Sequence, residues 1–474
     1  MKPYDITVIG AGSGGLVVAA AAAQLGARVA LVEKDRMGGE CLNTGCVPSK
    51  ALVHAARTVR TAAGAARFCA APPELRLDYG RVADYIRSAI AAIEPHDSAE
   101  RFRSLGCDVV MGAARFVSDR EIEVEGRRIE SRSFVVATGS SPLVPDIEGL
   151  RGLDVLTNEN VFELRELPPS LVVLGAGPVA VELGQAMARL GSKVTILQRS
   201  AHILSREDRD VRLKMEEILR AEGLDIITGA ALRRFEADGP AKVVFYERDG
   251  EERSLRADAL LCALGRVPNT GGLDLHAAGV DFDEKGITVD ERLRTSRPHI
   301  YACGDVTGPY RFTHMAAYQA GVIVRNAVFR LPAKVDYRTV PWVIFTDPEA
   351  ARVGMTEEQA RAADPKVRVY SFPFKDNDRA VTDDSTGGFV KLLCNGRGHI
   401  MGAHIVGPHA GELLAQITLA MRTGLTVDDI AATIHPYPTL SEAVKQAASL
   451  RMKSSLTPLR KKILKFLFRL HGED

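Results

Sequence analysis

Cysteine, aromatic side chains and an excess of one charge are all scarce in this sequence. Seven cysteines occur in 474 residues, which is too sparse and too uneven a set for a secreted disulfide scaffold. Aromatic residues make up 6% of the chain and the formal net charge is +1, so no surface for nucleic acid is expected. No paired CxxC motifs and no HExxH motif occur, and we therefore expect no bound metal.

A long unbroken hydrophobic run is also missing. The longest uncharged stretch, Ile6 to Ala27, is interrupted by four glycines between positions 10 and 15, where a signal peptide or a membrane span needs an unbroken apolar core. A strand, a tight turn and a helix fit this stretch better, and the cytoplasm is the expected compartment. Apolar residues make up 46% of the chain and charged residues 26%, the usual mixture for a globular protein of roughly two to four domains.

One strand–turn–helix–strand pattern occurs twice along the chain. It begins with the β-branched run 5–9, continues through a Gly-rich turn and an alanine-rich helix, and ends in the apolar run 28–32. The same pattern returns at 170–197, roughly 165 residues later. That separation is too long for a solenoid repeat and indicates two separate nucleotide-binding domains. From about Val340, strand-like runs alternate with amphipathic helices in an α+β pattern.

The first Gly-rich turn carries the pattern that a dinucleotide pyrophosphate requires. Gly10 permits the tight turn, Gly12 lets the backbone approach the pyrophosphate, and Gly15 lets the helix pack on the strand. The phosphates would lie at the helix N-terminus, whose free N–H groups and dipole favour anions. Glu33 ends the second strand, where an acidic side chain accepts from a ribose hydroxyl. The alternative is a turn that is tight for packing alone.

The second turn has the fingerprint Gly175-x-Gly177-x-x-Ala180 but no acidic residue after its second strand. Arg199 stands there instead, and together with Arg206 it could pair with a 2′-phosphate. NADPH is therefore favoured over NADH, which stays the alternative. A solvated loop charge is the competing interpretation of Arg199.

Cys41 and Cys46 lie in the segment with the clearest chemistry. Pro48 suits the first turn of a helix that would extend to about Val59. Cys46 would then lie at a helix N-terminus, where the dipole lowers the pKa of a thiol. Lys50 follows on the same helical face, and the two thiols therefore indicate a redox-active pair. The other cysteines are scattered singly and are expected to be buried as small hydrophobic residues: Cys69, Cys107, Cys262, Cys303 and Cys394.

The segment Gly38-Gly-Glu-Cys-Leu-Asn-Thr-Gly-Cys-Val-Pro-Ser-Lys50 closely resembles the redox signature of the flavin disulfide reductases. This family includes dihydrolipoamide dehydrogenase, glutathione reductase and mercuric reductase, and the resemblance extends to about Ala448. It implies that the first βαβ unit binds FAD and the second binds NAD(P)H. It also implies that electrons pass through the flavin to a Cys41–Cys46 disulfide, with Cys46 next to the flavin and Cys41 attacking the substrate.

Further motifs match the family. Asp305, in Tyr301-Ala-Cys-Gly-Asp305, resembles the residue that holds the ribityl chain, and Thr313 opens a helix aimed at the flavin pyrimidine ring. Glu182 matches the partner of Lys50 beside flavin N5, where either charge alone would be costly. The residues expected to contact the two cofactors are Gly10, Gly12, Gly14, Gly15, Glu33, Lys34, Gly39, Thr138, Gly139, Asp305, His314, Gly175, Gly177, Val179, Arg199 and Gly265.

Near its C-terminus the chain departs from dihydrolipoamide dehydrogenases, which carry His-x-His-Pro-Thr followed by Glu and use the second histidine as the acid–base. Tyr437 takes that place here, as in mercuric reductases, while Glu442 keeps the partner position. Tyrosine, with a pKa near 10, is a poor base at neutral pH. His435 could face the same pocket in an extended segment, although a structural histidine is the alternative. The C-terminal cysteine pair and the N-terminal metal-binding extension of mercuric reductases are missing, so the resemblance is to a mercuric-reductase-like enzyme.

The sequence therefore predicts an α/β fold with two Rossmann-like nucleotide-binding domains and a C-terminal α+β dimerisation domain. The resemblance implies a homodimer in which the interface domain lends His435, Tyr437 and Glu442 to the cysteine pair of its partner. The basic amphipathic stretch 456–470 can lie on an anionic membrane surface or bind a partner, although terminal helices more often pack on their own dimer. The expected boundaries are 1–150 for FAD binding, 151–270 for NAD(P)H binding, 271–339 for completing the FAD domain, 340–450 for the interface and 451–474 for the tail.

The leading functional hypothesis is an FAD-dependent NAD(P)H oxidoreductase that reduces a small-molecule disulfide or a thiophilic metal ion. Dihydrolipoamide dehydrogenase is the alternative within that class, disfavoured by Tyr437 and Arg199. A non-catalytic scaffold that keeps FAD only for stability is the alternative from a different class. The cysteine pair and its lysine–glutamate neighbours argue against a scaffold, which has no need of all four.

Overall fold

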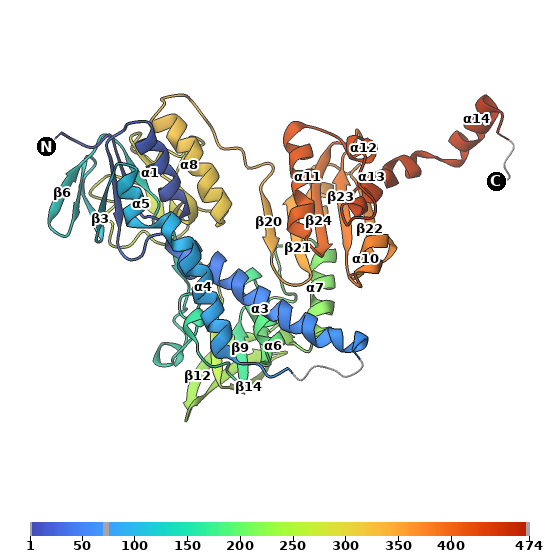
Figure 1. Ribbon diagram of the computed structural model, residues 1–474, viewed down its shortest axis with the longest axis horizontal. Coiled ribbons are helices and arrows are strands. Elements are labelled where there is room, and N and C mark those ends of the chain that lie inside the picture. The colour runs from blue at the N-terminus through green and yellow to red at the C-terminus, as the bar shows by residue number, and fades with distance from the viewer. Residues whose placement is uncertain (1, 70–74, 471–474) are drawn as a thin grey trace. The chain divides into compact units, whose positions relative to one another are not determined.

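The computed structural model describes residues 2–69 and 75–470, which form two compact units (Figure 1). Unit 1 contains 1–201 and 224–336, and unit 2 contains 202–223 and 337–474. The segment 202–223 follows the second βαβ pattern in the sequence but packs in unit 2. Within the described residues, no helix combines the length and the hydrophobicity that crossing a bilayer would require.

The first sheet of unit 1 is parallel, with strands in the order β19-β7-β1-β2-β3. Every residue of β1 and β2 is buried, as expected for a parallel sheet covered on both faces. Helices α1 and α8 pack together beside this sheet (Figure 1). The bounds are β1 Ile6–Ile9, α1 Ser13–Gln24, β2 Val29–Glu33, β3 Cys107–Met111, β7 Phe134–Val136, β19 Ile300–Ala302 and α8 Thr313–Ala327.

The second sheet of unit 1 repeats this plan in the order β11-β10-β9-β15, with all strands parallel. The helix α6 follows β9 and begins with Pro178, which suits a first helical turn. The bounds are β9 Ser170–Leu174, α6 Pro178–Arg189, β10 Lys193–Gln198, β11 Asp225–Thr228 and β15 Ala259–Cys262. Both predicted βαβ patterns are thus present in the structure.

Helices α2 to α5, between β2 and β3, and several short strands complete unit 1. The helices are α2 Gly39–Asn43, α3 Cys46–Gly64 and α4 Tyr79–Asp97, followed by the short α5 Ala99–Ser104. Two antiparallel meanders are formed by β4 Ala114–Ser118, β5 Glu121–Val124 and β6 Arg127–Glu130, and by β12 Ala231–Asp238, β13 Ala241–Arg248 and β14 Glu251–Ala257. Two strand pairs are β8 Ser140–Pro142 with β16 Arg266–Pro268, and β17 Phe282–Asp283 with β18 Gly286–Ile287.

Unit 2 is built on an antiparallel sheet in the order β20-β21-β24-β23-β22. Helix α11 packs on β21 and β24, α13 packs on β22 and β23, and α7 packs on β24. The strands are β20 Pro341–Ile344, β21 Glu349–Gly354, β22 Arg368–Pro373, β23 Phe389–Cys394 and β24 Ile400–Gly407. The helices are α7 Arg209–Ala221, α9 Glu357–Ala363, α10 Asp378–Thr382, α11 Ala410–Thr423, α12 Val427–Ala432, α13 Glu442–Ser455 and α14 Pro458–Phe468.

A buried lysine ties α7 to the sheet of unit 2. The Lys391 ammonium on β23 lies 2.8 Å from Asp208, 2.7 Å from Asp210 and 2.7 Å from Glu357. Its side chain is only 2% exposed, so the three carboxylates supply the hydrogen bonds that an ammonium needs away from water. The neighbouring His404 is fully buried, and burial lowers its pKa to about 4.

Two expectations about the segment after α3 need correction. The helix reaches Gly64 rather than about Val59; residues 70–74 lie outside the described part. Cys69 is exposed rather than buried. It follows a surface turn of 3-10 helix, Ala65–Phe68, in which no residue is buried. The other four scattered cysteines are buried as predicted.

Candidate active site

The glycines of the first fingerprint leave room for a phosphate group. Gly10 has a φ of +102°, and a Cβ on Gly15 would lie 1.9 Å from the Gly10 carbonyl oxygen, so both positions require glycine. A Cβ on Gly12 would meet nothing closer than the Cα of Gly39, at 3.8 Å. The space in front of Gly12 is therefore open, and it lies at the start of α1, where free N–H groups attract anions.

The carboxylate of Glu33 is held at the edge of this turn. It accepts hydrogen bonds from the backbone N–H of Ala11, at 2.7 Å, and of Asp35, at 2.9 Å. Two carboxylate oxygens offer about four acceptor sites, so the same group still has the capacity to accept from a ribose. Lys34 follows it on the surface. These residues fit the adenosine and pyrophosphate parts of FAD.

A second group of predicted FAD residues gathers around Asp305. The Ser140 hydroxyl donates to Asp305 at 2.6 Å, and Arg266 Nε lies 3.7 Å from the same carboxylate. Thr138 donates its hydroxyl to the backbone carbonyl of Asn269 at 2.7 Å. Gly139 and Gly265 have φ values of +70° and +140°, which glycine adopts without strain.

Sequence reasoning missed the charged network that borders this group. Arg266 forms an ion pair with Glu40, one residue before Cys41, and donates to the Ser140 carbonyl at 2.7 Å. Asn158 also donates to Glu40, at 3.1 Å. Burial raises the pKa of Glu40 to about 7 despite the arginine. The contacts join positions up to 226 residues apart, and no local pattern in the sequence indicates them.

Cys41 and Cys46 are free thiols at the junction of α2 and α3. The pKa of Cys46 is lowered to about 6, chiefly because the Cys41 thiol donates a hydrogen bond to it. The Thr313 hydroxyl, whose Oγ1 lies 3.3 Å from Cys46 Sγ, and the charge of Lys50 also stabilise the thiolate. The pKa of Cys41 is raised by the same hydrogen bond and by burial. At neutral pH the pair is therefore a Cys46 thiolate and a Cys41 thiol.

Thr313 is the first residue of α8, so α8 contributes to the cysteine site as well as to the predicted flavin site. His314 follows it, and its ring stacks on that of Phe312 with centroids 5.2 Å apart. Gly14, on α1, lies against α8, since a Cβ there would meet Ala316 at 3.5 Å. The N-termini of α1 and α8 therefore lie in the same part of unit 1 as Cys46 and Thr313.

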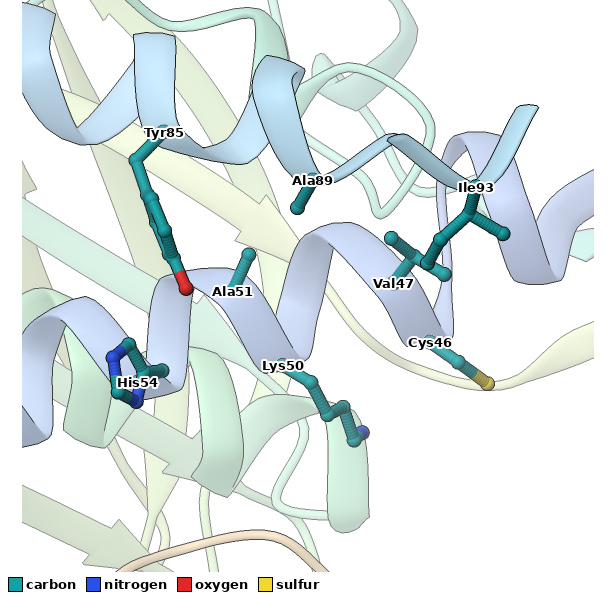
Figure 2. Close-up of a pocket in the computed structure, with 8 residues that line it drawn as sticks. All are labelled: Cys46, Val47, Lys50, Ala51, His54, Tyr85, Ala89 and Ile93. Atoms are coloured by element: carbon teal, nitrogen blue, oxygen red, sulfur yellow. The ribbon is translucent and has the colours of Figure 1, made fainter. Parts of the chain in front are cut away.

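Lys50 and Glu182 form the predicted ion pair, with Lys50 Nζ 2.8 Å from Glu182 Oε2. Glu182 is only 8% exposed and Lys50 is 35% exposed, so the glutamate depends on the lysine for charge compensation. Figure 2 shows the side chains of Lys50 and Cys46 leaving α3 on the side away from Tyr85. The lysine therefore lies close enough to favour the charged form of Cys46.

A groove of about 370 Å³ lies between α3 and α4 next to these residues (Figure 2). Cys46, Lys50 and His54 line it from successive turns of α3, and Tyr85 and Ile93 line it from α4. The rings of His54 and Tyr85 have centroids 5.8 Å apart. The walls of this groove are mainly apolar.

The second fingerprint also keeps an open approach. Gly175 has a φ of +98°, and a Cβ there would lie 2.6 Å from the Ala263 carbonyl oxygen, whereas a Cβ on Gly177 would meet nothing within 4 Å. Val179 is exposed in the first turn of α6. Arg199 is exposed just after β10, so its guanidinium is accessible to a phosphate. This arrangement fits the pyrophosphate of NAD(P)H.

The three predicted residues near the C-terminus lie in unit 2, whereas the cysteine pair lies in unit 1. The Tyr437 hydroxyl donates to Asp378 at 2.7 Å, and this hydrogen bond raises the pKa of the tyrosine. Nδ1 of His435 lies 3.0 Å from the Thr433 carbonyl, and Nε2 lies 3.0 Å from the Gln416 side chain. Glu442 begins α13. Asp378 and Gln416 were not identified from the sequence, because they come from other elements.

Comparisons with known proteins agree with this arrangement. Residues 4–320 match the family model described as pyridine nucleotide-disulphide oxidoreductase, and residues 340–448 match the dimerisation domain of the same family. A mercuric reductase of Staphylococcus aureus is 36% identical over 458 residues, covering 94% of this chain and 82% of that protein. A dihydrolipoyl dehydrogenase of Thermus scotoductus is 40% identical over 468 residues, covering 96% of this chain and 99% of that protein.

Solved structures give the same result. The Cu(II) complex of the HOCl-induced flavoprotein disulfide reductase RclA from Escherichia coli superposes with a TM-score of 0.86 at 30% identity. The superposition covers 95% of this chain and all of the other. The similarity therefore includes both units.

Proposed function

Because this chain belongs to the pyridine nucleotide-disulphide oxidoreductase family, whose enzymes use FAD and NAD(P)H, we propose that it reduces a small disulfide or a thiophilic metal ion. The observation that carries the proposal is the difference in pKa between the two thiols: the pKa of Cys46 is lowered to about 6, and that of Cys41 is raised. A pair poised in this way suits electron transfer better than packing. When bound, FAD would carry two electrons from NAD(P)H to the cysteines.

The residues of unit 1 support this chemistry through charge and hydrogen bonding. Thr313 and Lys50 stabilise negative charge on Cys46, the sulfur proposed to face the flavin. Glu182 holds the Lys50 ammonium in place. The Cys41 proton stays in the hydrogen bond to Cys46 until Cys41 reacts.

The two cysteines would reduce a disulfide substrate in two thiol–disulfide exchange steps. Cys41 attacks one substrate sulfur, the substrate S–S bond breaks, and a mixed disulfide forms. Cys46 then attacks Cys41, which restores the Cys41–Cys46 disulfide and releases the second substrate thiol. Two electrons leave with the substrate; the Cys41 proton goes to one product thiol, and the other product leaves as a thiolate that takes its proton from solvent. For a thiophilic metal ion, the same sulfurs would act as ligands.

The test is an anaerobic titration of the purified holoenzyme with NADPH. We expect two additional titratable thiols per subunit and a long-wavelength band from the thiolate beside the flavin, both absent in Cys46→Ala. Turnover with lipoamide, glutathione disulfide, Hg(II) and Cu(II) would then identify the acceptor. A flavoprotein that gains no thiols would overturn the proposal and favour a non-catalytic scaffold.

NADPH is the proposed electron donor because Arg199 stands where an NAD-specific site carries an acidic residue. Arg199→Glu should lower kcat/KM for NADPH by about tenfold or more and leave that for NADH unchanged or higher. Lys193→Glu, an exposed change at the start of the same strand, is the control. Equal loss with both nucleotides in Arg199→Glu would refute the assignment.

Dihydrolipoyl dehydrogenase is the second candidate, because the relative from Thermus scotoductus aligns over 96% of this chain. Tyr437 argues against it, since its proton is held by Asp378 and its pKa is raised. Such a group cannot accept a proton at neutral pH. Oxidation of dihydrolipoamide with NAD⁺ at the rate of lipoamide reduction would favour this candidate.

The matched dimerisation domain supports a homodimer, and we propose that each active site combines two subunits. Cys41 and Cys46 would come from one subunit, and His435, Tyr437 and Glu442 from the other. Hybrid dimers test this arrangement. Mixing Cys46→Ala subunits with Tyr437→Ala subunits should restore one intact site per hybrid and recover activity. No recovery after verified subunit exchange would exclude shared sites.

A further inference from the structure

The last helix, α14, runs from Pro458 to Phe468 beyond the matched dimerisation domain, and none of its residues is buried (Figure 1). It begins with a regular cap, in which the Thr457 side chain accepts a hydrogen bond from the N–H of Arg460. Pro458 occupies the first helical turn, where proline is favoured. The sequence therefore encodes a helix here although unit 2 does not cover it.

One face of α14 is apolar and fully available. Leu459, Ile463, Phe466 and Leu467 recur at the spacing that aligns side chains along a helix. Phe466 is 85% exposed and Leu459 is 69% exposed. A helix with such large side chains on its apolar face is stabilised when that face contacts another apolar surface, either protein or lipid.

The opposite face and the flanking chain are strongly basic. Lys461 and Lys465 lie on the face opposite the apolar stripe, and Lys462, four residues before Phe466, lies at the border between the two faces. Between Glu442 and Glu473 there are eight Lys or Arg residues and no acidic residue. The tail 451–474 itself has seven Lys or Arg residues and two acidic residues, Glu473 and Asp474, whereas the rest of the chain has 54 basic and 58 acidic residues; positive charge is therefore concentrated in the tail.

We propose that α14 binds flat on an anionic lipid bilayer, with its apolar face among the acyl chains and its lysines at the headgroups. Both features are those of interfacial helices, and the charge is complementary to acidic phospholipids. A second copy of α14 fits less well as the occupant, because pairing would bring two clusters of like charge together. The net negative remainder of the chain would be repelled by the same surface, so contact is confined to the tail.

Sedimentation of the full-length holoenzyme with vesicles tests the proposal independently of any acceptor. We expect binding to phosphatidylcholine vesicles that contain about one third phosphatidylglycerol, weakening with added salt, and none to pure phosphatidylcholine. Lys461→Gln/Lys465→Gln should weaken binding by about 25-fold, from about fivefold per charge. Ile463→Gln/Phe466→Gln, which keeps the charge, should weaken it by about tenfold or more.

The matched control is Lys366→Gln/Lys375→Gln, which removes two exposed lysines of unit 2 outside the tail and should not change vesicle binding. Equal binding to both kinds of vesicle, or loss of binding in the control, would overturn the proposal. Protection of the α14 amide hydrogens from exchange before vesicles are added would also overturn the proposal, because α14 would then pack on its own dimer. NADPH oxidation by both tail variants should equal that of the wild type, which separates this test from the proposed function.

Discussion

Replacing Thr313 by valine removes one hydrogen bond from the Cys46 thiolate and leaves the shape of the side chain nearly unchanged. The contact measures 3.3 Å from Oγ1 to Sγ. A hydrogen bond to a charged group contributes about 1.5–3 kcal/mol, and a long contact to sulfur belongs at the lower end. Since one pKa unit corresponds to about 1.36 kcal/mol, the pKa of Cys46 should rise by about one unit from its value of about 6.

The assay is the pH dependence of Cys46 alkylation by iodoacetamide in the anaerobically reduced protein, followed by mass spectrometry of the Cys46 peptide. Peptide mapping is needed because Cys69 is also exposed. At about pH 6.5 a pKa increase of one unit lowers the thiolate fraction, and hence the rate, about threefold. Thr313→Ser should restore the wild-type profile, and Thr58→Val, which removes an exposed hydroxyl from α3, should not alter it. An unchanged profile in Thr313→Val would refute the assigned hydrogen bond.

Three further predictions use the same structure. Gly12→Ala should give a folded but colourless protein, because the added Cβ meets no atom closer than 3.8 Å and fills only the space through which the cofactor approaches. Gly177→Ala should keep bound flavin and raise KM for NAD(P)H about tenfold. Flavin absorbance and circular dichroism distinguish the two variants. Lys50→Met should lower the free energy of unfolding by about 2 kcal/mol, because the buried Glu182 carboxylate loses the ammonium 2.8 Å away that compensates its charge. In urea titrations the double variant with Glu182→Gln should lose less than the two single losses combined. The pKa of His404 is about 6.5 in the unfolded state and about 4 in the folded state, so between these pH values the unfolded state binds more protons. The free energy of unfolding should therefore fall by about 3 kcal/mol as the pH drops through this window. His404→Gln should flatten this part of the stability profile.

The sequence was sufficient to predict the parts of the site that depend on local pattern. The turns at Gly10 and Gly175 have the expected positive φ values, and α3 begins at Cys46, because turn geometry and helix starts are set by neighbouring residues. The Lys50–Glu182 pair is present at 2.8 Å, although family resemblance rather than spacing indicated it. Their catalytic roles stay predictions.

The remaining contacts of the site could not be predicted, since they join distant positions. Thr313 reaches Cys46 across 267 residues of sequence, and a threonine at the start of a helix gives no sign of such a partner. Asp378 holds Tyr437 from a short helix 59 residues away. Both contacts alter pKa values, so the protonation states of the site depend on tertiary packing that pattern alone does not encode.

The ion cluster around Lys391 makes the C-terminal half of this protein a non-contiguous module. Two of the three carboxylates that neutralise the lysine come from 202–223, outside the span 340–448 of the matched dimerisation domain. A fragment beginning near residue 337 would keep only Glu357 beside a lysine sealed from water. Exchange of this domain between relatives, in the laboratory or during evolution, must therefore transfer α7 with it or replace Lys391 at the same time.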